Sequence, residues 1–379
     1  MREFLGSTFR ANPAYTLVQL DRLPEAERTL IQDSPDGGPD DELYGVLKPV
    51  RDHRLPVRAV SPDTALLLLT LATPGPLPGY VLAQLGRKAE AVIAALVLDG
   101  VLELELDSRY LSGTSAAEHL PDQDGPSTGR IGEVTAAALR YALSLDGLAE
   151  ADLAGRLYHY GREPVHPALR HRFPDGSAVA AYLGLVAGHA THTRLASAGW
   201  AESPHRPGEH RHWRQWRPAR QGMSTYKLYV SPTRNALPAV LADVVDVMSS
   251  TPGPTALKVG ADLADVCRPD KIVAYFAHLE DLQRCADVLR HRVGGQAAHG
   301  VSFTAAITVD GLLSWAADPP ARTSWRRWVT DRLAEHLVHA RAVSAADAAQ
   351  FALQRLRLEG IDTVAWVPTA HMWRETTGA

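Results

Sequence analysis

The chain has 379 residues, of which 45% are hydrophobic and 22% are charged, so it has the composition of an ordinary globular protein and the length of two or three domains. A formal net charge of -4 gives no sign of bulk nucleic-acid binding, and two cysteines, Cys267 and Cys285, exclude a disulfide framework and a CxxC metal pair. The first residues lack the apolar core of a signal peptide, and the longest apolar run, residues 65–72, is too short to span a bilayer. We therefore expect a cytoplasmic protein without a membrane partner.

Residues 1–122 are predicted to form an N-terminal region with a compact core at residues 45–113. A loop rich in Pro, Gly and Asp, residues 33–42, comes before this core. Ser61 and Pro62 are typical of a helix start, as cap and first-turn residue. The core is expected to begin with a helix at residues 65–72 and a turn at residues 74–79. Two more helices are expected at residues 80–85 and 88–99, followed by two strands at residues 101–106 and 109–111.

This order of helix, turn, helix and two-stranded wing resembles a winged helix. Winged helices often bind DNA through the second helix of the turn, but here Arg87 and Lys88 are nearly its only basic residues, so no nucleic-acid partner is expected. In peptide-modifying enzymes a similar fold binds the leader of a precursor peptide, which adds a strand to the sheet edge. A docking domain without a ligand is the remaining alternative.

A linker rich in Pro, Gly, Asp and Ser at residues 122–129 leads to a second domain, residues 130–372. Its pattern mixes amphipathic helices with short strands, which predicts an α+β fold. The expected helices are residues 131–145, 279–292, 325–340 and 345–358. The expected strands are residues 226–230, 256–259, 271–276, 301–307 and 363–367.

Three of these strands carry a lysine among apolar residues: Lys227 in Y-K-L-Y-V, Lys258 in A-L-K-V and Lys271 at the start of K-I-V-A-Y-F. Alternation puts Lys227 and Tyr229 on one face of their strand. A charged lysine in a strand normally lies at an edge or on a solvent face. Three in successive strands, with Arg268 close before the last, indicate a cationic cleft for an anion. Separate surface lysines are the alternative.

No cofactor or metal is expected. The histidines stand at no fixed spacing from acidic or cysteine ligands, and HExxH is missing. The P-loop pattern GxxxxGK[ST] is also missing from the sequence.

Residues 226–235 resemble the start of the lyase region of class III lanthipeptide synthetases. Those lyase regions look like the phosphothreonine lyases of type III effectors. A closer resemblance, over residues 130–370, is to the HopA-type effector family, whose domain is also the lyase component of class V lanthipeptide and thioamitide biosynthesis. The motifs that carry it are Y-K-L-Y-V-S-P, A-L-K-V-G-A-D, R-P-D-K-I-V-A-Y-F, G-V-S-F-T and D-G-L-L-S-W-A-A-D-P-P.

The resemblance implies β-elimination of phosphate from phosphorylated Ser or Thr. It assigns Lys258 as the base for the α-proton, Lys227 as a catalytic and phosphate-binding residue, and Arg268 and Lys271 as further phosphate ligands. Tyr229 stands where the phosphothreonine lyases have histidine. Because the ordinary pKa of tyrosine is near 10, Tyr229 is expected to donate a hydrogen bond to the leaving oxygen more readily than a full proton.

Four further residues are supporting candidates. Asp270 is expected to orient Lys271 or Arg268. The others are expected to shape the pocket: Asp310, Trp315 and Asp318.

The sequence thus predicts a lyase acting on a ribosomal precursor peptide. Because the chain has no kinase motifs, a separate Ser/Thr kinase-like phosphotransferase is the expected partner, with a cyclase as a further candidate. Two alternatives stay open. One is a non-catalytic peptide-binding scaffold, which lysines pointing apart would favour. The other is a winged-helix DNA-binding regulator, which would bind duplex DNA with a steep salt dependence.

Overall fold

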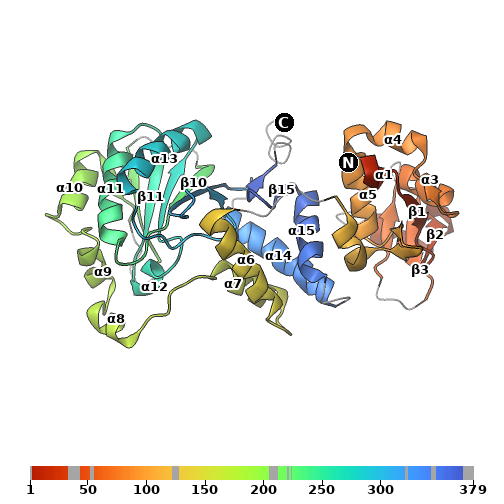
Figure 1. Cartoon of the computed structure of the whole chain (residues 1–379), viewed down its shortest axis with the longest axis horizontal. Helices are drawn as coiled ribbons and strands as arrows, with labels where there is room; N and C mark the ends of the chain where they lie inside the picture. Colours follow the sequence, from red (N-terminus) through yellow and green to blue (C-terminus); the bar gives the residue numbers. More distant parts are fainter. Residues whose placement is uncertain are drawn as a thin grey trace. The chain divides into compact units, whose positions relative to one another are not determined.

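The computed structural model describes residues 2–32, 43–51, 55–121, 128–204, 212–219, 222, 224–320, 323–342 and 347–369 (Figure 1). The chain divides into two compact units. Unit 1 comprises residues 1–122 and 339–358, and unit 2 comprises residues 123–338 and 359–379. The predicted loop at residues 33–42 and most of the predicted linker lie outside the described residues. The predicted α+β class is confirmed, because both units combine helices with sheets.

Unit 1 has two small antiparallel sheets, with strand orders β5-β1-β6-β7 and β2-β3-β4. Its strands are β1 (Thr8–Ala11), β2 (Tyr15–Gln19), β3 (Gly45–Pro49), β4 (Arg58–Val60), β5 (Gly75–Pro76), β6 (Leu102–Leu106) and β7 (Arg109–Leu111). Its helices are α1 (Arg2–Leu5), η1 (Leu20–Arg22), α2 (Glu25–Gln32), α3 (Pro62–Thr70), α4 (Gly79–Leu85), η3 (Gly86–Lys88), α5 (Ala89–Leu98), η4 (Gly113–His119) and α15 (Ala348–Leu358).

The predicted order of helices and strands between residues 45 and 113 is present. The Ser61 side chain accepts from the Thr64 N–H at the start of α3. Asp107 and Ser108 turn the chain between β6 and β7 with positive φ angles of 48° and 62°. This is the order expected of a winged helix, and the assignment to that fold stays a prediction.

Segments outside residues 45–113 also build unit 1, and β1 and α15 are two of them. The interior strand β1 comes from residues 8–11 and pairs with both β5 and β6. Helix α15, predicted within the domain at residues 130–372, packs in unit 1 instead. There the Gln354 amide donates to the Pro121 carbonyl at 3.2 Å, and Arg355 contacts Asp99 at 2.6 Å.

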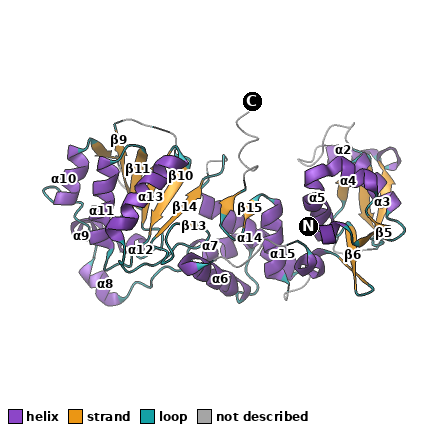
Figure 2. Cartoon of the chain, turned by 45° about the horizontal axis from the view of Figure 1, so that its top comes forward, coloured by secondary structure: helices purple, strands orange, loops and turns teal. Residues whose placement is uncertain are grey.

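Unit 2 is built on a seven-stranded sheet in which every pairing is antiparallel, with the order β13-β14-β10-β12-β11-β9-β8 (Figure 2). The strands are β8 (Trp200–Glu202), β9 (Trp213–Pro218), β10 (Tyr226–Val230), β11 (Pro254–Gly260), β12 (Ile272–Phe276), β13 (Ala305–Ala306) and β14 (Leu313–Ala317). The three strands predicted around lysines, β10, β11 and β12, are therefore confirmed, and they lie next to one another.

The helices of unit 2 are α6 (Gly129–Leu143), α7 (Glu150–Tyr158), α8 (Pro167–Arg172), α9 (Gly176–Tyr182), α10 (Ala190–Ser197), α11 (Leu237–Ser250), α12 (Leu263–Val266), α13 (Leu279–Val293) and α14 (Trp325–Arg341), of which the last three residues are assigned to unit 1. Of these, α11 and α13 lie alongside the sheet (Figure 1). They share its apolar core with the strand residues that alternate away from the lysines, including Leu228, Val230, Leu257 and Ala274. No helix among the described residues is both long and apolar enough to cross a membrane.

Two predicted strands are shorter than expected. The strand predicted at residues 301–307 is only β13, because Phe303 has a positive φ of 59° and the Thr304 hydroxyl turns back to the Val301 carbonyl at 2.6 Å. The strand predicted at residues 363–367 is a turn between two short strands, β15 (Ile361–Asp362) and β16 (Val367–Pro368).

We expect Leu257→Ala to destabilise unit 2 by roughly 2–5 kcal/mol, because a buried leucine in a packed core loses both its transfer free energy and its contacts. Urea unfolding followed by tryptophan fluorescence measures this, since all 8 tryptophans belong to unit 2. Val309→Ala is the control. That side chain is 82% exposed, so its change should stay within about 0.5 kcal/mol. Equal midpoints for both variants would contradict the packing described.

Candidate active site

The register of the central strands gathers basic and aromatic side chains on the sheet face opposite α11 and α13. Lys227 pairs with Tyr275, and Lys258 pairs with Val273, two residues before Tyr275 on the same strand. Directly paired residues share a face of the sheet, and so do residues two apart in one strand. Lys227, Tyr229, Lys258 and Tyr275 therefore lie on one face, as alternation predicted for Lys227 and Tyr229.

Tyr275 lies between two lysines. The Nζ atoms of Lys227 and Lys258 stand 5.4 Å and 5.1 Å from the centroid of its ring, within range of a cation–π contact. Burial, and then the charge of Asp318, raises the pKa of Tyr275, so its hydroxyl stays neutral. The aromatic ring thus holds the two ammonium groups near each other.

The two lysines differ in their counter-charge. Lys227 Nζ contacts Asp318 Oδ2 at 2.5 Å, and the other carboxylate oxygen of Asp318 accepts from the N–H of Trp325 at the start of α14. No carboxylate among the described residues forms an ion pair with Lys258. Burial, followed by the charges of Lys227 and Arg217, lowers the pKa of Lys258, and Asp318 opposes this only in part. Lys258 is thus the lysine of this face whose surroundings favour the neutral amine.

Tyr229 is buried beside this pair, with 3% of its surface exposed. Burial and then the charge of Asp318 raise its pKa well above the ordinary value of 10.0. Its hydroxyl therefore keeps its proton at neutral pH, and it suits hydrogen-bond donation better than complete proton transfer.

A second cluster adjoins the lysines. Asp270 binds both Nε and Nη2 of Arg268 at 2.9 Å and Arg326 Nη1 at 2.8 Å. Burial alone would raise the pKa of Asp270, but the guanidinium groups of Arg326 and Arg268 hold it below its ordinary value. The sequence predicted Lys271 or Arg268 as the partner of Asp270, and in the structure Asp270 binds Arg268. Arg268 also lies over the rings of Tyr158 and Trp213, at 5.6 Å and 4.9 Å.

The ammonium group of Lys271 is bound by residues outside these two clusters. Lys271 is fully buried, and its ammonium donates to the Pro232 carbonyl at 2.7 Å and lies 3.0 Å from His299 Nδ1. The Nε2 of His299 faces the Gly161 carbonyl at 2.6 Å, so it carries the hydrogen and leaves Nδ1 to accept from Lys271. These contacts fit a structural role better than the phosphate-binding role predicted from the sequence.

Of the remaining candidates, one contacts the site. Asp318 does so through Lys227. Trp315 pairs with Leu228 and packs on the apolar core, so it faces away from the lysines. Asp310 is exposed in the turn before β14, where its carboxylate accepts from the Thr308 hydroxyl and the Leu312 N–H.

Three site residues were missed from the sequence: Tyr275, Arg326 and Arg217. Alternation within residues 271–276 could have identified Tyr275. Arg326 begins a helix far along the chain, and Arg217 comes from β9, a strand that the sequence did not predict, so local pattern gave no signal for either. No group of three or more metal-ligating side chains was found among the described residues.

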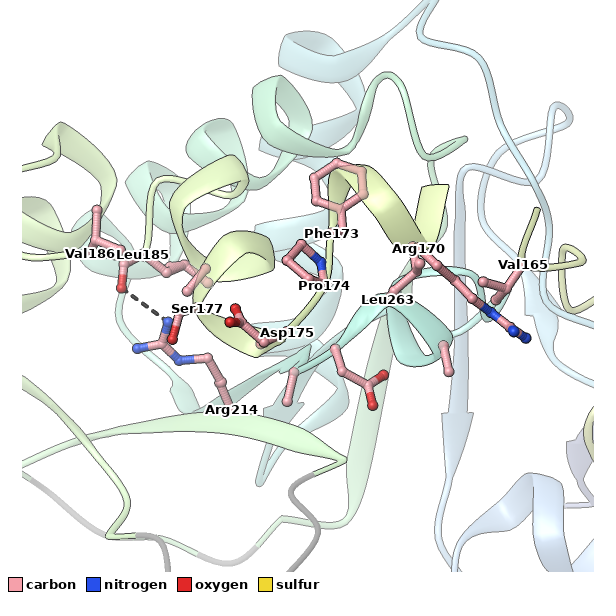
Figure 3. A pocket seen from close by; sticks show the side chains of 15 residues that line it. Val165, Arg170, Phe173, Pro174, Asp175, Ser177, Leu185, Val186, Arg214 and Leu263 are labelled. Atoms are coloured by element: carbon pink, nitrogen blue, oxygen red, sulfur yellow. Dashed lines mark hydrogen bonds between the residues drawn. The ribbon is translucent and has the colours of Figure 1, made fainter. Parts of the chain in front are cut away.

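A hollow of about 890 Å³ lies apart from this face, lined by residues of α8, α9 and α12 (Figure 3). Arg214 in its wall pairs in register with Val259, which belongs to the apolar face, and donates to the Leu185 carbonyl at 3.0 Å. None of the three lysines lines this hollow.

No protein-family model and no curated protein matches the sequence. Among solved structures, the chain is similar to an effector protein from Pseudomonas syringae pv. tomato strain DC3000, with a TM-score of 0.40 and 12% identity over 63% of this chain and 97% of that one. An effector protein from Pseudomonas syringae pv. syringae strain 61 gives a TM-score of 0.40 and 14% identity, over 63% of this chain and 98% of that one. The type III effector and phosphothreonine lyase OspF from Shigella flexneri gives a TM-score of 0.29 and 12% identity, over 48% of this chain and 97% of that one. These values describe a distant similarity of fold.

We expect the wild type to gain stability relative to Lys271→Met as pH rises. Burial lowers the pKa of Lys271 from 10.5 to about 8 in the folded chain, so the unfolded chain binds this proton more tightly. Stability linked to Lys271 therefore increases between pH 8 and 10.5. Urea unfolding of both proteins across this window measures the difference. A difference that does not change with pH would contradict the buried position of the ammonium.

Proposed function

We propose that the protein is a lyase that removes phosphate by β-elimination from phosphorylated Ser or Thr of a peptide, leaving dehydroalanine or dehydrobutyrine. The observation that carries this proposal is the setting of Lys258. It is a half-buried amine without a carboxylate ion-pair partner among the described residues, and burial, followed by the charges of neighbouring cations, lowers its pKa. Removal of a weakly acidic α-proton needs such a neutral base.

The balance of charge on this face supports a dianionic substrate. The contacts and electrostatic interactions described join five basic side chains and two carboxylates, namely Lys227, Lys258, Arg217, Arg268, Arg326, Asp270 and Asp318. With Lys258 neutral, two positive charges remain in excess. A phosphate monoester at neutral pH carries about two negative charges.

Each group has a place in the reaction. Lys258 takes the α-proton, and the electron pair forms the Cα=Cβ bond as the Cβ–O bond breaks and phosphate leaves with its electrons. Lys227 contacts the phosphate, and Tyr229 donates a hydrogen bond to the leaving oxygen. The proton on Lys258 then passes to phosphate or solvent. Arg268, already bound to Asp270 through two nitrogens, stabilises the phosphate at longer range.

The resemblance in sequence motifs supports a finer assignment. The substrate is a ribosomal precursor peptide of the lanthipeptide or thioamitide type, phosphorylated by a separate Ser/Thr kinase-like enzyme and passed on to a cyclase. Unit 1 binds the leader of that peptide. Nucleic acid, membrane and cofactor have no part in this proposal, and the enzyme works in the cytoplasm.

The non-catalytic scaffold is the main alternative. It would be favoured by lysines that point apart. Lys227 and Lys258 both lie against Tyr275, which favours catalysis, whereas Lys271 lies elsewhere. No contact of the described residues favours the DNA-binding regulator.

Lys258→Ala should abolish elimination and leave affinity for a phosphopeptide largely intact, because a neutral base adds little to ground-state binding. Mass spectrometry of a phosphothreonine peptide incubated with the full chain measures loss of phosphoric acid, and fluorescence anisotropy measures binding. Arg284→Ala, at an exposed position on α13, is the control and should behave as wild type. If Lys258→Ala retains wild-type turnover, the proposed base is wrong.

Tyr229→Phe should slow elimination by about tenfold to a hundredfold, the size of one hydrogen bond of roughly 1.4–2.7 kcal/mol. The raised pKa of Tyr229 is the reason for expecting this limited loss. Rates are compared for a phosphoester and for a peptide with a better leaving group. A far larger loss that shrinks with the better leaving group would identify Tyr229 as an obligatory acid instead.

A further inference from the structure

The register extends the site one strand beyond Lys258. Gln215 of β9 lies directly opposite Lys258 of β11, and Arg217 is two residues further along β9, on the same face. Diagonal neighbours across a strand pair are about 7–8 Å apart, within reach of long side chains. The Gln215 amide, turned with its oxygen toward the guanidinium, accepts from Arg217 Nε at 2.8 Å and from an Nη at 3.0 Å. The neutral Gln215 side chain thus orients Arg217 without neutralising its charge.

Arg217 and Lys227 lie on opposite sides of Lys258 along the sheet, since the strand order is β10-β12-β11-β9. In the proposed reaction the α-carbon lies against Lys258 Nζ, and its phosphate arm extends toward Lys227 and Tyr229. The other substituents of the α-carbon then extend toward β9. One of them is the carbonyl of the phosphorylated residue, whose oxygen gains negative charge as the α-proton leaves.

We propose that Arg217 is a catalytic residue that binds this carbonyl oxygen and stabilises the enolate formed when Lys258 removes the α-proton. Three observations carry the inference: Arg217 shares the face of Lys258, it is exposed, and no carboxylate among the described residues forms an ion pair with it. The Cα–H electron pair moves first to the carbonyl oxygen beside Arg217. It then forms the Cα=Cβ bond as phosphate leaves with the electrons of the Cβ–O bond. The inference rests on the proposed function.

The test compares wild type with Arg217→Ala, Arg217→Lys and the surface control Arg284→Ala. The substrate is a blocked hexapeptide with one central phosphothreonine. The binding probe is the same peptide with a CH₂ group in place of the bridging oxygen, a phosphonate that cannot eliminate. Turnover is measured by phosphate release, and affinity for the phosphonate by fluorescence anisotropy. The kinetic isotope effect is measured with the α-deuterated substrate.

We expect Arg217→Ala to lower kcat by about a hundredfold to a thousandfold, the usual cost of removing one oxyanion donor. Affinity for the phosphonate should stay within about threefold, because the carbonyl carries little charge in the ground state. The isotope effect should rise, since proton abstraction becomes more fully rate-limiting. Arg217→Lys should recover part of kcat, and Arg284→Ala should match wild type.

Other outcomes overturn the inference. If kcat of Arg217→Ala is unchanged, Arg217 has no role in the reaction. If its loss of phosphonate affinity accounts for the whole loss of rate, Arg217 binds the phosphate and not the carbonyl. Both results leave the lyase function standing, because wild type still eliminates phosphate. If wild type releases no phosphate from the phosphothreonine peptide or its phosphoserine counterpart, the proposed function fails together with this inference.

Discussion

The antiparallel register of β10, β12 and β11 is the constraint on which the rest of unit 2 depends. Because directly paired residues share a face, the pairing of Lys227 with Tyr275 and of Lys258 with Val273 puts both lysines and Tyr275 on one side of the sheet. The residues between them, such as Leu228 and Leu257, pack against helices on the other side. A slip of one residue would bury both lysines in the apolar core, where a charge without a partner is costly. Core packing therefore fixes the position of the site.

Buried charge explains how the site is held. Asp270 lies between Arg268 and Arg326, and Asp318 binds Lys227 while it accepts from the backbone of α14. Charges removed from water are stable only when paired and hydrogen-bonded. These carboxylates satisfy three of the cations. Among the described residues, the basic side chains of this face without an ion pair to a carboxylate are Lys258, the base of the proposed chemistry, and Arg217, at the open side of the sheet.

Part of the fold and of the site could be predicted from the sequence because it depends on local pattern. Apolar runs with the alternation of a strand predicted β10, β11 and β12, and the expected strands at residues 101–106 and 109–111 correspond to β6 and β7. The hydrophobic pattern could not place Trp315, which faces the core, or Lys271, whose ammonium is held by a carbonyl and a histidine. Both depend on the neighbouring strand or loop, which lies far away in the sequence.

By itself, the sequence determined the α+β class, the three lysine-bearing strands and the candidate chemistry of their side chains. These follow from the period of two along a strand and from residue type, which are properties of a few consecutive residues. The tertiary structure alone decided that Lys227 is ion-paired with Asp318, that Tyr275 lies between Lys227 and Lys258, and that Arg217 joins them. The physical reason is that a pKa and a cation–π contact depend on distances across strands, and the register sets these distances only when the whole core packs.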